Sequence, residues 1–299
     1  MLIGVDAGGS RTTAAVANAS SRVLARAEAG AGALRPGQAA VAAAAIFAAA
    51  RDALQRARLR PPAEAMVIGA SGASDPAERE ALGAALEGCG LATRLVIVTD
   101  AEIALEAAFG KQPGIVLIAG TGSVAWARLP DGSSARAGGL GPVLGDRGSG
   151  HDLGREALRT IGAGMELGLA LDLAKAVATH LGIGEEELSR WSLGASVSAV
   201  AALGSVLLDA ARTGDTVART IALQSARALA ALATTLAARF PRSAPATIAW
   251  GGGLLASQPG YRTMVIECLR EDLPGSRIAE SPIDAVLGAI SMARQLGTD

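Results

Sequence analysis

Residues 2–17 read L-I-G-V-D-A-G-G-S-R-T-T-A-A-V-A. The apolar run at 2–5 predicts a strand, the small and polar residues at 6–10 predict a tight turn, and residues 12–17 predict a second strand. A third strand is expected at 22–27. Glycines in such a turn let backbone N–H groups approach a phosphate closely, and hydroxyls add hydrogen bonds. We interpret the turn as a phosphate-binding hairpin, with an ordinary hairpin turn as the alternative.

The same pattern returns in the second part of the chain. Residues 115–119 form an apolar run, 120–123 read G-T-G-S, and further strands are expected at 124–129 and 134–137. Two phosphate-type hairpins at matching positions indicate a polyphosphate that is held from both halves.

This repeat predicts two similar α/β domains, with a boundary near residue 112. We expect the first domain to cover 1–112 and a terminal helix at 285–299, and the second to cover 113–284. A cleft between two such domains is the usual place for a ligand.

Two acids follow strands of the first half. The carboxylate of Asp6 is placed to hold Mg²⁺ through a water molecule. Asp100 ends the apolar run at 95–99, a position that suits a general base in a domain cleft. The alternative for Asp100 is a helix N-cap, since Asp is favoured there.

Six of the thirteen residues from 138 to 150 are glycine. A segment with so little side chain cannot pack a core and is expected to approach a ligand. Asp146 inside it is a natural acceptor for substrate hydroxyls. The alternative is a flexible surface linker, but Val143 and Leu144 and the low serine content disfavour it.

A third glycine cluster, Gly251, Gly252 and Gly253, follows an expected strand. It formally matches a dinucleotide fingerprint that ends at Ala256, but the N-terminal strand–helix–strand context is missing. We therefore interpret the cluster as a glycine-lined slot for a purine.

The composition excludes several classes of protein. Three Trp, one Tyr and three Phe, with a net charge of −1, do not suit a protein that stacks nucleic-acid bases. Cys89 and Cys268 lie far apart, which excludes a zinc cluster and a disulfide scaffold and predicts a reducing, cytoplasmic compartment. The apolar run at 39–50 is too short to span a membrane, and the uncharged stretch at 191–208 contains enough Ser and Gly to favour a buried helix. No P-loop and no serine-hydrolase elbow are present.

Taken together, these segments resemble the superfamily of sugar kinases, heat-shock chaperone ATPases and actin. Within it the chain is similar to the N-acetylglucosamine kinase family, which is grouped with BadF/BadG-type ATPases. The specific motifs are T-D-A at 99–101, A-G-T-G-S at 119–123, P-D-G-S at 130–133 and G-G-L-G-x-x-x-G-D-x-G-S at 138–149. The resemblance spans nearly the whole chain. It implies an α/β fold of two actin- or ribonuclease-H-like domains with mixed sheets flanked by helices and an interdomain cleft.

The resemblance also implies an activity, the ATP-dependent phosphorylation of an amino sugar, most simply N-acetylglucosamine at its 6-hydroxyl. ATP and Mg²⁺ would be the cofactors, Asp100 the general base and Asp6 the organiser of Mg²⁺. The implied partners are a small sugar and ATP, with no nucleic acid and no membrane, and a homodimer is possible. The residues assigned to the nucleotide are Gly8, Gly9, Ser10, Arg11, Thr12, Gly120, Thr121, Gly122, Gly251, Gly252 and Gly253. Those assigned to the sugar are Ser123, Gly139, Leu140, Asp146 and Gly150.

Three departures from the family pattern concern the sugar end. The stretch at 30–37 contains no Asn, Leu140 replaces an aromatic residue, and Arg147 replaces an acid. The sugar alternatives are therefore glucosamine or a muramic-type sugar whose anionic group meets Arg35 or Arg147. A function of another class is an ATPase switch that activates a partner enzyme.

Overall fold

The computed structural model describes residues 1–297, which form two compact units. The first unit joins Met1–Gln112 to the C-terminal segment from Ile283 onward, and the second is Pro113–Pro282. The terminal helix expected at 285–299 is α12, Ala285–Gly297; the last two positions of that prediction lie outside the described residues.

The first unit is built on a five-stranded mixed sheet. Its central strand β1 pairs antiparallel with β2 and parallel with β4. The strand order across this sheet is β3 (Val23–Ala29), β2 (Thr12–Ala17), β1 (Leu2–Ala7), β4 (Ala63–Ala70) and β5 (Ala92–Thr99).

The second unit repeats this arrangement with its own strands. Here β6 is central, antiparallel to β7 and parallel to β9. The order is β8 (Ser134–Gly138), β7 (Ser123–Arg128), β6 (Gly114–Ala119), β9 (Thr247–Gly251) and β10 (Arg277–Ile278). The predicted fold class, with two mixed sheets flanked by helices, is confirmed.

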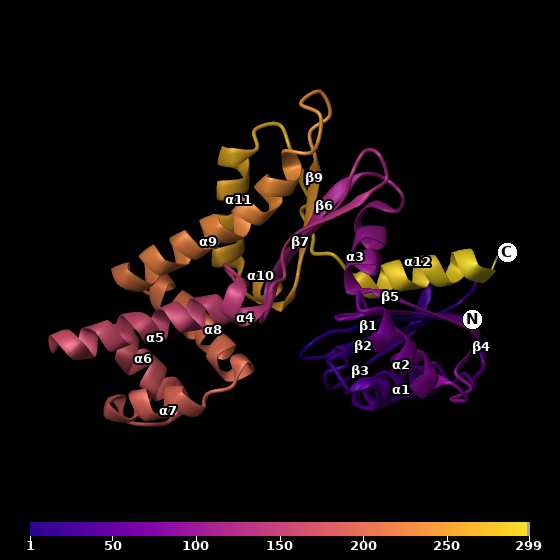
Figure 1. The fold of residues 1–299 in the computed structure, drawn as a ribbon, viewed down its shortest axis with the longest axis horizontal. Coiled ribbons are helices and arrows are strands. Elements are labelled where there is room, and N and C mark those ends of the chain that lie inside the picture. The colour runs from indigo at the N-terminus through magenta and orange to yellow at the C-terminus, as the bar shows by residue number, and fades with distance from the viewer. Residues whose placement is uncertain (298–299) are drawn as a thin grey trace. The chain divides into compact units, whose positions relative to one another are not determined.

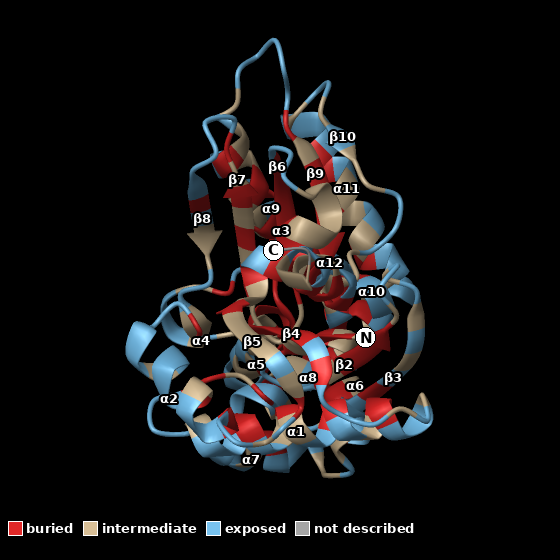
Figure 2. Cartoon of the chain, turned by 90° about the vertical axis from the view of Figure 1, so that its right-hand side faces the viewer, coloured by how far each residue is buried: buried red, intermediate tan, exposed pale blue. Residues whose placement is uncertain are grey.

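Helices cover both faces of the first sheet because alternate residues of a strand point to opposite faces (Figure 1). Ile3 and Val5 of β1 belong to the core beneath α1 (Ala39–Arg56), whereas Leu2 belongs to the core beneath α3 (Asp100–Phe109) and α12. Figure 2 shows the buried residues concentrated on these strands and on the inner sides of the helices. The unit also contains α2 (Pro76–Leu86).

Helices dominate the second unit between residues 141 and 237. The described helices are α4 (Gly141–Leu144), α5 (Gly150–Leu167), α6 (Asp172–Leu181), α7 (Leu188–Gly194), α8 (Val197–Arg212), α9 (Thr216–Ala237), α10 (Gly253–Ser257) and α11 (Pro259–Asp272), with a 3₁₀ turn at Glu185–Glu187. The uncharged stretch at 191–208 forms most of α7 and α8, and Leu203 and Leu207 are fully buried. None of the helices within residues 1–297 is both long enough and apolar enough to cross a membrane.

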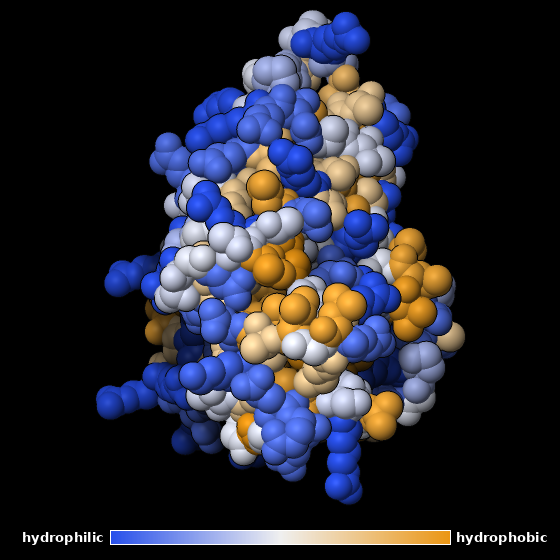
Figure 3. All heavy atoms as spheres, turned by 90° about the vertical axis from the view of Figure 1, so that its left-hand side faces the viewer, coloured by the Kyte–Doolittle hydropathy of each residue, from blue (hydrophilic) through white to orange (hydrophobic). Residues whose placement is uncertain are grey.

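Some large apolar side chains near the end of α5 and in α7 are exposed, among them Leu167, Leu169 and Leu193. Figure 3 shows apolar side chains grouped between polar ones on the face that it views. The homodimer stays a prediction.

Glycine allows α5 and α8 to approach each other at backbone distance. A Cβ added to Gly154 of α5 would lie 1.9 Å from the carbonyl oxygen of Val200, and one added to Gly204 of α8 would lie 2.7 Å from that of Gly150. Because both obstacles are backbone atoms, a side chain at either position requires the helices to move apart.

We therefore expect Gly154→Ala to lower the free energy of unfolding by about 1–3 kcal/mol, the usual cost of overpacking a core. Gly162→Ala is the matched control on the same helix, where an added Cβ meets nothing within 4 Å. This control is expected to gain about 0.5–1 kcal/mol from helix propensity. Denaturant unfolding of both variants measures the difference, and equal effects would contradict the close contact of the helices.

Candidate active site

The carboxylate of Asp100 lies where β5 ends and α3 begins. The N-cap of α3 is Thr99, whose Oγ1 accepts a hydrogen bond from the Glu102 N–H at 3.2 Å, while Glu102 accepts one from the Thr99 N–H at 2.8 Å. The N-cap alternative for Asp100 was therefore wrong, because the preceding threonine fills that role in a reciprocal capping box. The Asp100 carboxylate is left to other partners.

Those partners are few. Asp100 Oδ1 accepts from the Ala101 N–H at 3.0 Å, and the Ser71 hydroxyl also donates to the carboxylate. Burial raises the pKa of Asp100, and these two hydrogen bonds, together with one from its own backbone, oppose the rise. A carboxylate with a raised pKa accepts a proton more readily than an exposed one, which suits a general base.

The ends of three parallel strands bring Asp6 near Asp100. Ala7 of β1 pairs with Ala70 of β4, and Ala70 pairs with Thr99 of β5, so the three strands end at one edge of the sheet. Burial raises the pKa of Asp6 to about 6, and the negative charge of Asp100 adds to the rise while Arg11 opposes it. The sheet thus gathers two carboxyls that are far apart in sequence.

Oxygen donors are what Mg²⁺ prefers, and this ion usually keeps several of its waters. Among residues 1–297, no three His, Cys, Asp or Glu side chains come close enough to enclose a metal ion directly. The pair Asp6 and Asp100 therefore fits an ion held through water better than one held in a protein cage.

The first glycine turn is closed by its own backbone. The Gly8 N–H donates to the Arg11 carbonyl at 2.9 Å, and the Gly8 carbonyl accepts from Gly32 and Ala33. Thr12 is fully buried, and its hydroxyl donates to the Gly30 carbonyl at 2.8 Å, so it braces the turn from within. Gly9, Ser10 and Arg11, also assigned to the nucleotide, are exposed.

The second glycine turn is bonded to the start of α5. The Gly120 carbonyl accepts from the Gly150 N–H at 2.8 Å, and the Thr121 carbonyl accepts from the His151 N–H at 3.1 Å. A Cβ added to Gly150 would lie 3.2 Å from the Gly120 oxygen. Gly150, predicted to line the sugar site, therefore lies directly against the predicted phosphate turn.

The glycine-rich loop folds back onto the same turn through Asp146. This residue is buried and has a left-handed backbone with φ of 56°. Its Oδ1 accepts from the Ser123 N–H at 3.3 Å, and a Cβ on Gly122 would lie 2.8 Å from its Oδ2. Burial raises the pKa of Asp146, and the Ser123 N–H opposes the rise. Glycine at 122 is what allows this carboxylate to approach the turn.

Of the other residues predicted to bind the sugar, Ser123 and Gly139 are hydrogen-bonded within the protein and Leu140 is exposed. The Ser123 hydroxyl donates to the Arg147 carbonyl at 2.8 Å, and the Ser123 carbonyl accepts from the Gly139 N–H at 2.9 Å. Both residues therefore brace the loop through these bonds. Leu140 is 56% exposed, which leaves its side chain open to a ligand.

The third glycine cluster also meets the second phosphate turn. Gly252 has φ of 92°, and a Cβ on it would lie 2.3 Å from the Ala119 carbonyl oxygen. A Cβ on Gly120 would lie 3.7 Å from the Gly253 nitrogen. Within the second unit, the structure thus brings together the predicted purine slot, the phosphate turn and the sugar loop.

Two residues that the sequence analysis did not select also belong to this region. Asp152 follows Ser149 by three positions, the spacing of a helix capping box, which was a usable signal. Tyr261 is the only tyrosine of the chain and lies more than a hundred positions away, and its hydroxyl donates to the Gly148 carbonyl at 2.8 Å. No local pattern marks Tyr261, because this contact exists only in the folded unit.

The raised pKa of Asp6 predicts a pH-dependent stability. Between the ordinary value of 3.8 and about 6, the native state binds more protons than the unfolded state, so this group lowers stability as pH rises through that window. We expect Asp6→Asn to be more stable than the wild type at about pH 7.5, with a much smaller gain at about pH 4. Thermal unfolding at both values is the measurement, and a gain independent of pH would contradict the assignment.

Two curated relatives of this chain carry the names of sugar kinases. One relative, an N-acetylmuramic acid/N-acetylglucosamine kinase from Clostridium acetobutylicum, is 39% identical over 95 residues, which are 32% of this chain and 31% of the relative. Another, an N-acetyl-D-glucosamine kinase from Dictyostelium discoideum, is 27% identical over 205 residues, which are 66% of this chain and 64% of the relative. The matched segments thus span less than two thirds of either curated relative.

A solved structure matches over nearly the full length. It belongs to a protein from Chromobacterium violaceum that carries a provisional N-acetylglucosamine kinase name, with 30% identity, a TM-score of 0.84 and 98% of both chains covered. The family model of the BadF/BadG/BcrA/BcrD ATPases matches residues 3–293. The chain belongs to the BadF/BadG/BcrA/BcrD ATPase family.

Proposed function

We propose that this protein uses ATP to phosphorylate an amino sugar, with N-acetylglucosamine as the preferred substrate and its 6-hydroxyl as the acceptor. The observation that carries the proposal is the half-buried carboxylate of Asp100, which does not cap α3 because Thr99 and Glu102 form the capping box. The names of the relatives and of the structural neighbour support the substrate class.

Phosphoryl transfer requires positioning, neutralisation of charge and a base near the nucleophile. Asp100 takes the proton of the attacking sugar hydroxyl. Residues 9–11 of the first glycine turn and 121–122 of the second hold the phosphates, while the N–H groups of Gly8 and Gly120 close the turns by bonding to the Arg11 and Gly122 carbonyls. The turn at 251–253 holds the purine. Asp6 holds Mg²⁺ through water, and the ion neutralises phosphate charge when it is bound.

The sugar is held mainly by hydrogen bonds in this proposal. Asp146 accepts from sugar hydroxyls, since its carboxylate lies against the second phosphate turn and accepts a hydrogen bond from the Ser123 N–H. Leu140 supplies an apolar contact where the family has a ring that stacks. The shortage of aromatic side chains makes Asp146 the main determinant of sugar affinity.

Asp100→Asn tests the proposed base. A positioned base contributes about 10²–10⁴ in rate, so we expect kcat for N-acetylglucosamine to fall by about that factor while the KM for ATP changes little. ADP release is measured in a coupled assay with N-acetylglucosamine, glucosamine and no sugar. Glu102→Gln is the control on the same helical turn, because glutamine also completes a capping box.

The same assay separates the alternatives. If the protein prefers glucosamine, glucosamine replaces N-acetylglucosamine as the proposed substrate. ADP release that needs no sugar would favour an ATPase switch that activates a partner. Full sugar turnover by a folded Asp100→Asn variant would contradict the mechanism.

N-acetylmuramic acid is a second candidate substrate. The Clostridium relative carries this sugar in its name, and Arg147, within the glycine-rich loop, is exposed. An exposed guanidinium is able to pair with the carboxylate of the lactyl group. We expect Arg147→Gln to lower kcat/KM for N-acetylmuramic acid by about tenfold and to leave N-acetylglucosamine nearly unchanged. Arg35→Gln is the parallel test. A wild type that does not phosphorylate N-acetylmuramic acid would remove this candidate, and variants that use it as well as the wild type does would remove the role of the two arginines.

A further inference from the structure

The backbone of Gly148 is held from two sides by buried side chains. Asp152 Oδ2 accepts from the Gly148 N–H at 2.8 Å, and the Tyr261 hydroxyl donates to the Gly148 carbonyl at 2.8 Å. A Cβ on Gly148 would lie 2.5 Å from the Cβ of Leu229 in α9, and its φ is 75°. Two hydrogen bonds and close packing therefore fix this position of the loop.

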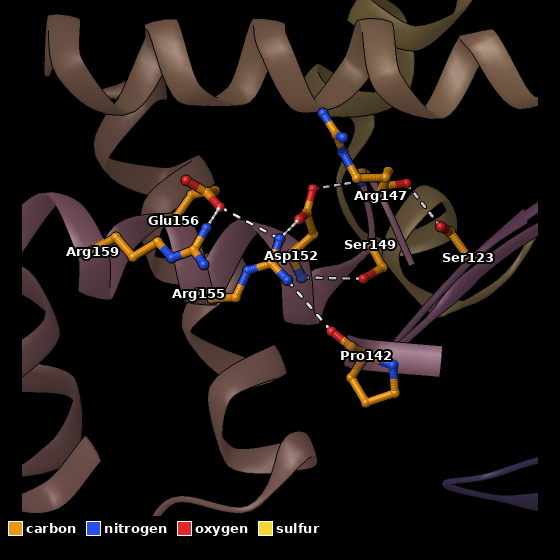
Figure 4. A network of polar contacts seen from close by, with 9 residues as sticks. Ser123, Pro142, Arg147, Ser149, Asp152, Arg155, Glu156 and Arg159 are labelled. Carbon is orange, nitrogen blue, oxygen red and sulfur yellow. Dashed lines mark hydrogen bonds and ion pairs between the residues drawn. The ribbon is translucent and has the colours of Figure 1, made fainter. Parts of the chain in front are cut away.

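Asp152 is also joined to the other end of the loop (Figure 4). Its Oδ1 accepts from Nη2 of Arg155, and Nη1 of the same arginine donates to the Pro142 carbonyl in α4 at 3.4 Å. The Asp152 side chain is only 6% exposed, so Arg155 supplies the positive charge that such a buried carboxylate requires. We call Asp152, Arg155 and Tyr261 the loop clamp.

Helix capping does not account for Asp152. In a capping box, the acid three residues after the N-cap returns to the N–H of the N-cap itself. Ser149 is the N-cap of α5 and accepts from the Asp152 N–H at 3.2 Å, but the Asp152 carboxylate bonds to Gly148, one residue before the cap. The Asp152 carboxylate therefore holds the backbone of the loop and does not cap the helix.

The loop needs such support because of the strained residue it carries. Asp146 has a left-handed φ of 56°, which is uncommon for a residue with a side chain. The Ser149 N–H donates to the Asp146 carbonyl at 3.1 Å, which closes a turn around Arg147 and Gly148. By holding Gly148, the loop clamp holds the turn that directs the Asp146 carboxylate.

We propose that Asp152, Arg155 and Tyr261 are positioning residues that set the Asp146 carboxylate for the hydroxyls of the sugar. The inference rests on the proposed function, since it assigns Asp146 to the sugar. The clamp acts through the loop and touches neither the sugar nor the phosphates.

Tyr261→Phe is the mildest test, because it removes one hydroxyl and keeps the ring. Loss of this buried hydrogen bond is expected to raise the KM for the sugar about three- to tenfold, with kcat and the KM for ATP within about twofold of the wild type. Asp152→Ala leaves the Gly148 N–H without its acceptor and is expected to raise the sugar KM by about tenfold or more.

Arg159→Ala is the matched control. Arg159 lies on the same helix and pairs with Glu156, as Arg155 does, but within residues 1–297 this ion pair does not reach the loop. We expect its sugar KM to equal that of the wild type. An unchanged sugar KM in the folded Tyr261→Phe and Asp152→Ala variants overturns the proposal. A lower kcat in both variants with every KM unchanged also overturns it, because that result indicates a smaller fraction of active molecules.

Amide hydrogen exchange of the segment 145–150 separates this inference from the proposed function. Exchange is expected to be faster in Tyr261→Phe than in the wild type, and unchanged in Arg159→Ala. A wild type that phosphorylates no amino sugar overturns the proposed function, and exchange then decides by itself whether the clamp holds the loop. An active wild type whose variants keep both the sugar KM and the exchange rate overturns the clamp alone.

Discussion

Each unit depends on a central strand that is antiparallel to one neighbour and parallel to the other. The antiparallel side makes a tight hairpin, and the parallel side brings other strands to an end at the same edge. In the first unit this edge carries the glycine turn, Asp6 and Asp100. In the second unit it carries the turn at Gly120 and the glycines that follow β9. Pairing of the backbone therefore decides where the chemistry of both units is placed.

Glycine has two distinct roles in the second unit. At Gly252 it permits a positive φ and removes a side chain that would collide with the Ala119 carbonyl. At Gly122 it leaves space for the carboxylate of Asp146. In both places a backbone or a charged group occupies the position of the missing Cβ. The abundance of glycine is therefore a requirement for close approach at the predicted site.

The predictions about the fold and the site rest on local sequence patterns that form the expected strands and turns in the structure. Strand, turn and strand at 2–17 and again at 115–129 were sufficient to predict two similar sheets, because hairpins are encoded by neighbouring residues. Asp100 was selected for its position at a strand end. Its alternative as an N-cap was wrong, since Thr99 and Glu102 form the capping box.

The sequence by itself determined the fold class, the repeat and the candidate phosphate, base and sugar segments, because each depends on short-range patterns of apolar, glycine and acidic residues. Only the tertiary structure decided which of these residues are exposed and which use their polar groups for bonds within the protein. Thr12 and Ser123 use their hydroxyls within the protein, and Tyr261 reaches Gly148 from a distant helix. Hydrogen bonds between segments far apart in the chain follow from how helices pack on a sheet, and no local pattern encodes them.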